Sequence, residues 1–555
     1  MLPSGMNCTA RASSGYDRAS VAGKQPPIEE ATDLLIVGAG TAGLAAALAA
    51  AGRGVRITLV DENPVPVATM GEDVPLHFGG RIAASAANHN AVLESILRAR
   101  PRIAEAIEAG VDVRLRTTVW GLFPQRHTTG WIEGHVAGLA DEDRTYLLRF
   151  GQAIVASGAR DMGLAFEGWQ RPGVMGALAA HRLARDYEAL DCSCAVLLGS
   201  GTEALQIGNA LMDAGMGLAA IVEQGEAVGG PSELASRLIA GGARLFTRHV
   251  IQQAQGDERR VAAVELARVD AQGNRLPDDP TRIPCDTVLL GVAAVPSIEL
   301  LESAGCAVSF QAARGGHAPV LDESQRTSLP FVYAAGDCAG IWPTKTLSDQ
   351  TACREGRVAA LAALRALGAA RAGGEQEPPV CPDPTVRDIG AERLAWVRAM
   401  TLRAGARAFV CQCEEVTAAD ILELNPPRYL GWRRPAALDT RLASLDPGCP
   451  PDPDVVKRLT RAGMGACQGR RCREQIAALV ALGAGTGLAE VALATYRPPV
   501  RPLRLTQLAA LPEAAAMSEG WESWFGIQSQ WVPFWRLPGA HGAAEPDPDR
   551  PVLGE

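Results

Sequence analysis

Two glycine-rich segments of similar pattern predict an α/β protein with two Rossmann-like domains, and two close pairs of cysteines mark a further compact module near the C-terminus. Residues 33–61 are predicted to form a strand, a tight turn, an Ala/Leu-rich helix and a second strand. The same order begins again at Ala195, about 160 residues later. Each segment is one βαβ unit of a parallel sheet, so the 555 residues hold at least two such domains.

The composition argues against several classes of protein. The 53 basic and 62 acidic side chains give a net charge of −9 with no dense basic block, which disfavours a nucleic-acid partner. Thirteen cysteines in so long a chain are typical of reduced thiols in the cytoplasm, some of them metal ligands, rather than of a secreted disulfide scaffold. The apolar run Leu34–Gly52 holds four glycines that a strand, turn and helix explain, so no membrane span is predicted.

The first glycine motif has the form GxGxxG directly after a strand. Gly38 permits the tight turn, Gly40 lets a pyrophosphate approach the backbone, and Gly43 allows close packing of helix on strand. Asp61 ends the second strand 23 positions after Gly38, where a carboxylate accepts hydrogen bonds from a ribose, and Glu62 is the alternative. Dinucleotide binding is therefore predicted, against the alternative that the glycines serve helix packing alone.

The second glycine motif has the form GxGxxA. It consists of Gly199, Gly201 and Ala204, and Glu223 ends the strand that follows. A carboxylate at that position favours NAD over NADP because it repels a 2′-phosphate. The open alternative is a retained fold that binds no nucleotide.

The segment TSLPFVYAAGD (327–337) resembles the second flavin-contacting motif of the two-dinucleotide-domain flavoproteins. Two further segments, VASGAR (155–160) and LLGVAAVPS (289–297), are similar to crossover segments of the same family and stand in the family's order. The resemblance covers about residues 31–370 and implies bound FAD, with Asp337 after Gly336 holding a ribityl hydroxyl. It also implies that the inserted second domain is an NAD(P)-binding fold.

The cysteines form the pattern Cys411-Gln412-Cys413, followed 53 residues later by the segment CQGRRC, which holds Cys467 and Cys472. Two close pairs of thiolates bind zinc or an iron–sulfur cluster. The surrounding segments CQCEEVT and TRAGMGACQGRRC resemble the bacterioferritin-associated-ferredoxin-like domain, which implies a small helical domain with a [2Fe-2S] cluster on these four cysteines. The interval between the pairs exceeds the family's usual length, and the excess contains Cys449, a rival ligand. Structural zinc and no metal remain the alternatives.

The order of these domains resembles the α subunits of multi-subunit amine and imino-acid dehydrogenases, such as opine oxidases and the cyanide-forming glycine dehydrogenase. The stretch GARDMGLAFEGWQRPGVMG (158–176) strengthens the resemblance. It implies an electron-transferring subunit that works with two partners, a flavin-containing β subunit plus a small ferredoxin-like γ subunit. A self-contained NAD(P)H-dependent reductase is the rival enzyme, and an iron–sulfur scaffold is the non-enzymatic alternative.

Three further features remain to be placed. The family's GGQ loop is Gly79-Gly80-Arg81 in this chain; Gly80 lets the loop approach the flavin, whereas Arg81 departs from the pattern. The tail after Met517 carries four tryptophans and suggests a packing surface for a partner. His77 and His89 flank the diglycine loop, but surface or packed histidines are the favoured interpretation and no catalytic base is assigned.

The predicted boundaries follow from these motifs. They are a disordered leader at 1–30, an FAD-binding domain at 31–165 and 286–370, an inserted NAD(P)-binding-like domain at 166–285, a linker at 371–405, a [2Fe-2S]-binding domain at 406–490, and an arm with a Trp-rich tail at 491–555.

Overall fold

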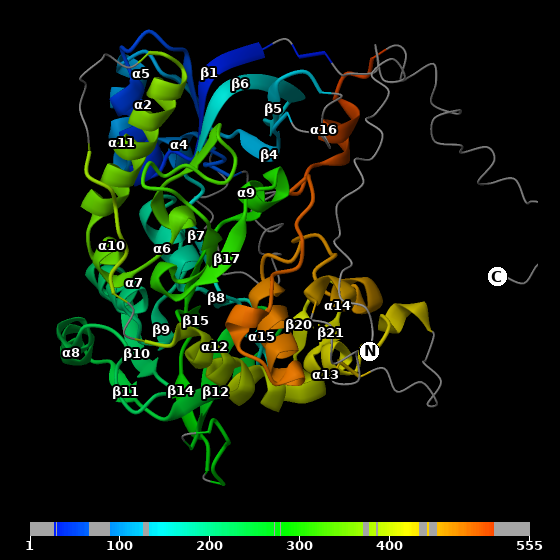
Figure 1. The fold of residues 1–555 in the computed structure, drawn as a ribbon. Helices are drawn as coiled ribbons and strands as arrows, with labels where there is room; N and C mark the ends of the chain where they lie inside the picture. Colours follow the sequence, from blue (N-terminus) through cyan, green and yellow to red (C-terminus); the bar gives the residue numbers. More distant parts are fainter. Residues whose placement is uncertain are drawn as a thin grey trace, which may run out of the picture.

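The computed structural model describes residues 27–28, 30–65, 89–125, 132–270, 272–277, 279–369, 377–384, 387–431, 441–442 and 452–514 (Figure 1). Several predicted features lie outside these residues: His77, Gly79, Gly80, Arg81, Trp432, Cys449, the side chain of His89, the leader up to residue 26 and the tail from Met517.

The first sheet is built around strand β1 (Glu30–Val37), whose apolar residues Leu34, Leu35 and Ile36 are fully buried by helices and neighbouring strands. In the described residues it has seven strands in the order β3-β2-β1-β6-β5-β4, and β19 pairs with the end of β6. β1, β2, β3, β19 and the second half of β6 run parallel, whereas β4 and β5 are antiparallel. The other bounds are β2 (Ile57–Val60), β3 (Asp112–Arg114), β4 (Thr118–Phe123), β5 (His135–Ala140), β6 (Thr145–Val155) and β19 (Val332–Ala334).

Two helices pack side by side on one face of this sheet (Figure 1). Helix α2 (Thr41–Ala50) consists almost wholly of alanine and leucine, and helix α11 (Asp349–Ala366) approaches it so closely that a Cβ on Gly356 would lie 2.1 Å from the Ala42 carbonyl oxygen. Leu34–Gly52 is therefore strand, turn and helix as predicted, and no helix among the described residues is long and apolar enough to cross a membrane. Smaller helices of this half are α4 (His89–Ala99), α5 (Arg102–Glu108), α9 (Glu299–Ala304) and α10 (Pro343–Leu347).

The second sheet is wholly parallel and has the order β11-β10-β9-β15-β8. An antiparallel sheet of β12, β13 and β14 packs beside it. These two sheets with their parallel strands confirm the predicted α/β class. The bounds are β8 (Val174–Gly176), α6 (Ala177–Arg185), β9 (Cys194–Leu198), α7 (Thr202–Asp213), β10 (Gly217–Val222), α8 (Ser232–Ala240), β11 (Arg244–Phe246), β12 (His249–Gly256), β13 (Val261–Arg268), β14 (Thr281–Pro284) and β15 (Thr287–Leu290).

Short elements connect the two halves. They are β7 (Ala159–Asp161), β16 (Ala294–Pro296), β17 (Val308–Gln311), η3 (Ala312–Arg314), β18 (Gly316–Pro319) and η4 (Gly336–Ala339). β7 and β16 pair with each other where the chain enters and leaves the inserted domain.

The C-terminal module packs against the second half and shares one hydrophobic core with it (Figure 1). Its helix α15 (Arg473–Ala484) begins directly after Cys472 and is buried along most of its length. The indole Nε1 of Trp169 donates a hydrogen bond of 2.9 Å to the Phe409 carbonyl oxygen. The remaining bounds are η6 (Gly405–Arg407), β20 (Phe409–Cys411), β21 (Val416–Thr417), α13 (Ala418–Leu422), η7 (Arg428–Leu430), α14 (Pro453–Thr460) and η9 (Leu488–Glu490).

Two connecting segments are more structured than the sequence suggested. The predicted linker 371–405 contains helix α12 (Ile389–Val397) and the π-helical turn η5 (Arg398–Leu402), where Trp396 and Met400 join the shared core. The arm that follows residue 491 returns to the first sheet (Figure 1). There the Val500 N–H donates a hydrogen bond of 2.9 Å to the Trp120 carbonyl oxygen. The arm also contains helix α16 (Leu505–Ala509).

Candidate functional site

The first glycine motif forms a tight turn with open space in front of it. Gly38 has φ +107°, and a Cβ there would lie 2.3 Å from the Ala156 carbonyl oxygen; a Cβ on Gly43 would lie 1.8 Å from the Gly38 carbonyl oxygen. A Cβ on Gly40 would meet nothing within 4 Å. Since Gly40 precedes the N-terminus of α2, this space offers free N–H groups and a favourable dipole to an anion.

The carboxylate of Asp61 lies beside this turn. It accepts a hydrogen bond of 2.6 Å from the Ala39 N–H and one of 2.8 Å from the Asn63 N–H, and Arg100 lies 3.6 Å away. Glu62 instead pairs with Arg501 of the C-terminal arm. Asp61 is therefore the acid that faces the glycine turn.

A cavity of about 170 Å³ joins these groups. Its walls come from the first glycine motif, the ends of β2 and β6, α9, the arm and the loop 461–472 between α14 and α15, which holds Cys467 and Cys472 and is called the cysteine loop below. They include Gly38, Gly40, Asp61, Ser157, Gly158, Arg182, Glu299, Arg470 and Arg501.

The second predicted flavin motif lies against the start of α2. Gly336 has φ +75°, and a Cβ there would lie 3.0 Å from the Cβ of Ala42. Asp337 follows in η4, directly after β19, which pairs with β6. A buried ion pair that the motifs do not reveal holds this turn: the Lys345 ammonium lies 2.7 Å from the Glu355 carboxylate. Strands β1 and β19, which lie about 300 residues apart in the sequence, thus bring the first glycine motif and the second flavin motif together.

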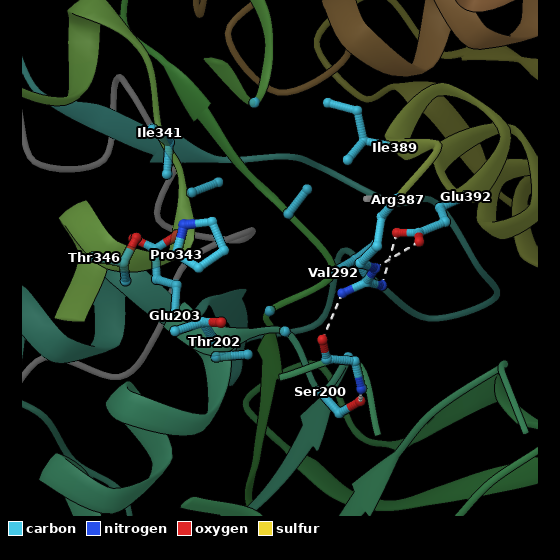
Figure 2. A pocket seen from close by; sticks show the side chains of 18 of the residues that line it. Ser200, Thr202, Glu203, Val292, Ile341, Pro343, Thr346, Arg387, Ile389 and Glu392 are labelled. Carbon is cyan, nitrogen blue, oxygen red and sulfur yellow. Dashed lines mark hydrogen bonds and ion pairs between the residues drawn. The ribbon is translucent and has the colours of Figure 1, made fainter. Parts of the chain in front are cut away.

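The second glycine motif lines a larger cavity of about 580 Å³ (Figure 2). Gly199 has φ +97°, and a Cβ on Gly201 would meet nothing within 4 Å. Ala204 fits as third residue because Gly291 faces it: a Cβ on Gly291 would lie 2.7 Å from that of Ala204. Glu223 accepts hydrogen bonds from the Ser200 hydroxyl at 2.6 Å and the Gly225 N–H at 2.9 Å, so it is oriented beside the turn.

Charged groups face this cavity from two sides (Figure 2). Arg387 makes a two-pronged ion pair with Glu392, at 2.7 and 2.8 Å, and donates a hydrogen bond of 2.6 Å to the Gly229 carbonyl. Across the cavity, burial raises the pKa of Glu203 to about 8, and the nearby carboxylates of Asp337 and Asp161 add to the rise. Burial and these two carboxylates therefore favour the neutral form of Glu203.

The four predicted cysteine ligands stand as two contacting pairs. Cys411 is hydrogen-bonded to Cys472, and Cys413 to Cys467. Hydrogen bonds from the Cys413 thiol and from two backbone N–H groups of the loop lower the pKa of Cys467 to about 6. The Gly463 N–H lies 3.3 Å from the sulfur of Cys411. Within the part of the chain that is described, no three Cys, His, Asp or Glu side chains surround a single point as ligands of one ion.

The cysteine loop is tied to the first domain by buried charges. Arg160, the last residue of the VASGAR segment, contacts Glu299 at 2.7 Å and Glu474 at 2.5 Å. Arg473 pairs with Glu302 at 2.6 Å. Their partners are distant in sequence, so sequence reasoning missed this network; the position of Arg160 inside a family motif was the one available signal.

Two dinucleotide folds with open glycine turns, joined through a discontinuous first domain, define a nucleotide-dependent oxidoreductase of the flavoprotein type. Residues 32–358 match the pyridine nucleotide-disulphide oxidoreductase family, and the chain belongs to this family. It is accordingly an FAD-dependent oxidoreductase. Residues 452–511, which include Cys467 and Cys472, match the sarcosine oxidase A3 domain.

Curated relatives agree with the resemblance predicted from the motifs. An opine oxidase subunit of Agrobacterium tumefaciens is 28% identical over 87% of this chain and 92% of its own length. Hydrogen cyanide synthase subunit HcnB of Pseudomonas aeruginosa is 26% identical over 79% of this chain and 90% of its own. The solved structure of L-proline dehydrogenase from P. horikoshii has a TM-score of 0.56 at 19% identity, over 87% of this chain and 81% of that chain, and so shares the fold.

Proposed function

We propose that this protein is the electron-transferring α subunit of a multi-subunit amine or imino-acid dehydrogenase, with FAD in the first dinucleotide fold and a [2Fe-2S] cluster on Cys411, Cys413, Cys467 and Cys472. The observation that carries the proposal is the pairing of Cys411 with Cys472 and of Cys413 with Cys467, where the loop of the second pair packs directly on the first domain.

The first domain fits FAD. Gly40 leaves space open that a pyrophosphate would fill, and Asp61, held beside this turn, would accept hydrogen bonds from a ribose. Asp337 follows Gly336, which lies against the start of α2, and would hold the ribityl chain. When bound, the flavin supplies the electron-transfer chemistry, and the chain's own residues bind it and fix its orientation. Gly80 is proposed to approach the same cofactor.

The cysteine loop fits a two-iron cluster better than one zinc ion. Each iron of a [2Fe-2S] cluster takes two protein ligands, so two thiol pairs match its needs. Zinc would instead gather all four thiolates around a single ion.

The relatives suggest the substrate class and the partners. The names opine oxidase and sarcosine oxidase indicate that these relatives act on amines of amino-acid type, and both relatives are named as subunits. We therefore propose a flavin-containing β subunit that oxidises the amine, a small ferredoxin-like γ subunit, and a cytoplasmic location.

Purification tests the two cofactors. The protein is expected to carry FAD, about two iron and about two labile sulfide per chain. One zinc without sulfide would overturn the cluster. Co-expression with a neighbouring β gene is expected to give a stable complex with amine dehydrogenase activity, which the isolated chain lacks. Truncation at Met517 is expected to weaken that complex while FAD content stays unchanged.

A self-contained NADH-dependent reductase is the second candidate, and the cavity of about 580 Å³ at the second glycine motif favours it. Its oriented Glu223 suits NAD. Stopped-flow mixing of the single chain with micromolar NADH separates the two functions. Fast, stoichiometric bleaching of the flavin that Gly201→Val abolishes would establish the reductase, whereas slow or absent bleaching supports the role of electron-transferring subunit.

A further inference from the structure

The cavity of about 580 Å³ at the second glycine motif has two different ends. At one end, Ser200 accepts a hydrogen bond of 2.9 Å from the Gly229 N–H and donates one of 2.6 Å to Glu223. Arg387 binds the Gly229 carbonyl oxygen at this end, and Glu203 lies across the cavity from it (Figure 2). Because the acid that ends the second strand holds the adenosine ribose of a dinucleotide, the end at Glu203 is left for the other half of the ligand.

The side chain of Glu203 faces this open space without a protein partner. Its carboxyl group has no hydrogen bond or ion pair with any residue that the structure describes. Neither carboxyl oxygen is sealed off by surrounding atoms, and Figure 2 shows the side chain on the cavity wall beside Pro343 and Thr346. A largely buried polar group without a partner is unfavourable, so a proton or a ligand group is needed to balance it.

The surroundings of Glu203 are acidic. The carboxylates of Asp337 in η4 and Asp161 in β7 act on it, and the guanidinium of Arg182 in α6 opposes them. Asp337 belongs to the second flavin motif, so this acidic end of the cavity is also the end that adjoins the first domain.

Other charges on the helices that pack against α7 are bound elsewhere. Lys345 of α10 is held in a buried ion pair, and Arg237 of α8 pairs with Asp213 at the far end of α7. His181 of α6 interacts with neighbouring charges on or just after its own helix. None of these groups therefore neutralises Glu203.

We propose that Glu203 binds the nicotinamide ring of NAD and that the acidic end of the cavity prefers the oxidised ring, which is cationic, to the reduced ring, which is neutral. The inference rests on the NAD site proposed at the second glycine motif and deepens it. The open turn at Gly201 and the N-terminus of α7 meet the pyrophosphate, and the carboxylates beyond them meet the cation. The cavity therefore distinguishes two redox states of one ligand by their charge.

The test compares Glu203→Gln with Glu233→Gln in the full-length protein. Both glutamates lie in the first turn of a helix of the same domain, but Glu233 is exposed on α8 and does not line the cavity. Calorimetric titration gives Kd for three ligands. They are NAD⁺, tetrahydro-NAD, whose neutral ring cannot donate a hydride, and ADP-ribose, which has no nicotinamide.

The expected results follow from the charge of Glu203. Its pKa is raised to about 8, so the carboxylate prevails at about pH 9 and the neutral form at about pH 6.5. At about pH 9 the parent is expected to bind NAD⁺ about 10-fold more tightly than tetrahydro-NAD, because a neighbouring opposite charge is worth about one pKa unit or more. Glu203→Gln is expected to lose this preference through a rise of about 10-fold in Kd for NAD⁺, with Kd for ADP-ribose unchanged. At about pH 6.5 the parent and Glu203→Gln are expected to agree, and Glu233→Gln is expected to match the parent at both pH values.

Four outcomes would overturn the inference. They are equal affinity of the parent for NAD⁺ and tetrahydro-NAD at about pH 9, an unchanged Kd for NAD⁺ in Glu203→Gln, an equal loss of ADP-ribose affinity in that variant, and the same loss in Glu233→Gln. Glu203→Asp keeps the charge and is expected to keep the preference for NAD⁺. If Glu203→Asp and Glu203→Gln both fail to bind ADP-ribose, the residue is structural and the inference fails. If the parent binds neither NAD⁺ nor ADP-ribose, the proposed NAD site fails and the inference with it, whereas FAD and iron content test the electron-transferring role separately.

Discussion

The buried pair of Lys345 and Glu355 clamps the turn that carries Asp337. The Lys345 ammonium donates to the carbonyl oxygens of Gly336 and Gly340, both at 2.8 Å, and Glu355 accepts the Gly336 N–H at 2.7 Å. Their side chains are 2% and 0% exposed. Replacing Glu355 with Leu leaves an ammonium buried without its carboxylate, which costs about 3–5 kcal/mol.

The two single replacements are expected to differ. Burial raises the pKa of Glu355, while Lys345 opposes the rise. In Lys345→Met the carboxyl group can therefore take up a proton and become neutral, so this variant is expected to lose less stability than Glu355→Leu. The double variant removes both charges and is expected to recover part of the loss.

Urea unfolding of the parent and the three variants, followed by flavin fluorescence and by circular dichroism, measures these differences. FAD affinity is expected to fall in Glu355→Leu because the turn that presents Asp337 loosens. A loss below about 1 kcal/mol in Glu355→Leu with unchanged FAD affinity would refute the clamp. Equal losses of stability in Lys345→Met and Glu355→Leu would refute the idea that Glu355 takes up a proton when Lys345 is replaced.

Three further predictions concern the sites. Gly40→Val is expected to fold, because its side chain meets open space, but to retain no FAD; full FAD occupancy would contradict the placement of the cofactor. Cys472→Ser is expected to lose iron whereas Cys449→Ser keeps it, and iron loss in the second would show that the ligands are wrongly assigned. Because the pKa of Glu203 is raised to about 8 from 4.5, its neutral form stabilises the fold below about pH 4.5 and this contribution is lost as pH rises through 8. Glu203→Gln should remove that decline between about pH 5 and 8, and identical profiles of Tm against pH would contradict it.

Local sequence patterns were sufficient to predict the parts of the fold that consist of one continuous segment. Each βαβ unit is a continuous segment whose apolar strands, Ala-rich helix and turn glycines all agree, and the structure contains both. The opposite roles of Gly38 and Gly40, one confined and one open, follow from the same turn geometry.

What the sequence could not reveal depends on contacts between distant segments. The predicted linker forms α12 because Trp396 and Met400 find a core made by strands more than 100 residues earlier. The segment CQGRRC does not reveal that its two arginines have different surroundings. Only the folded chain, in which Arg160 holds the loop, separates Arg471 near the thiols from Arg470 in the cavity wall.

The late arrival of strand β19 has a consequence for synthesis of the protein. Its partner β6 ends at Val155, whereas β19 begins at Val332, so the intervening domain must leave the ribosome before the first sheet is complete. At about 5–20 residues per second, this edge of β6 stays unpaired for about 9 to 36 seconds. An exposed edge can pair with other nascent chains. Early folding of the inserted domain shortens the unfolded chain between β6 and β19, and this protects the incomplete sheet while translation continues.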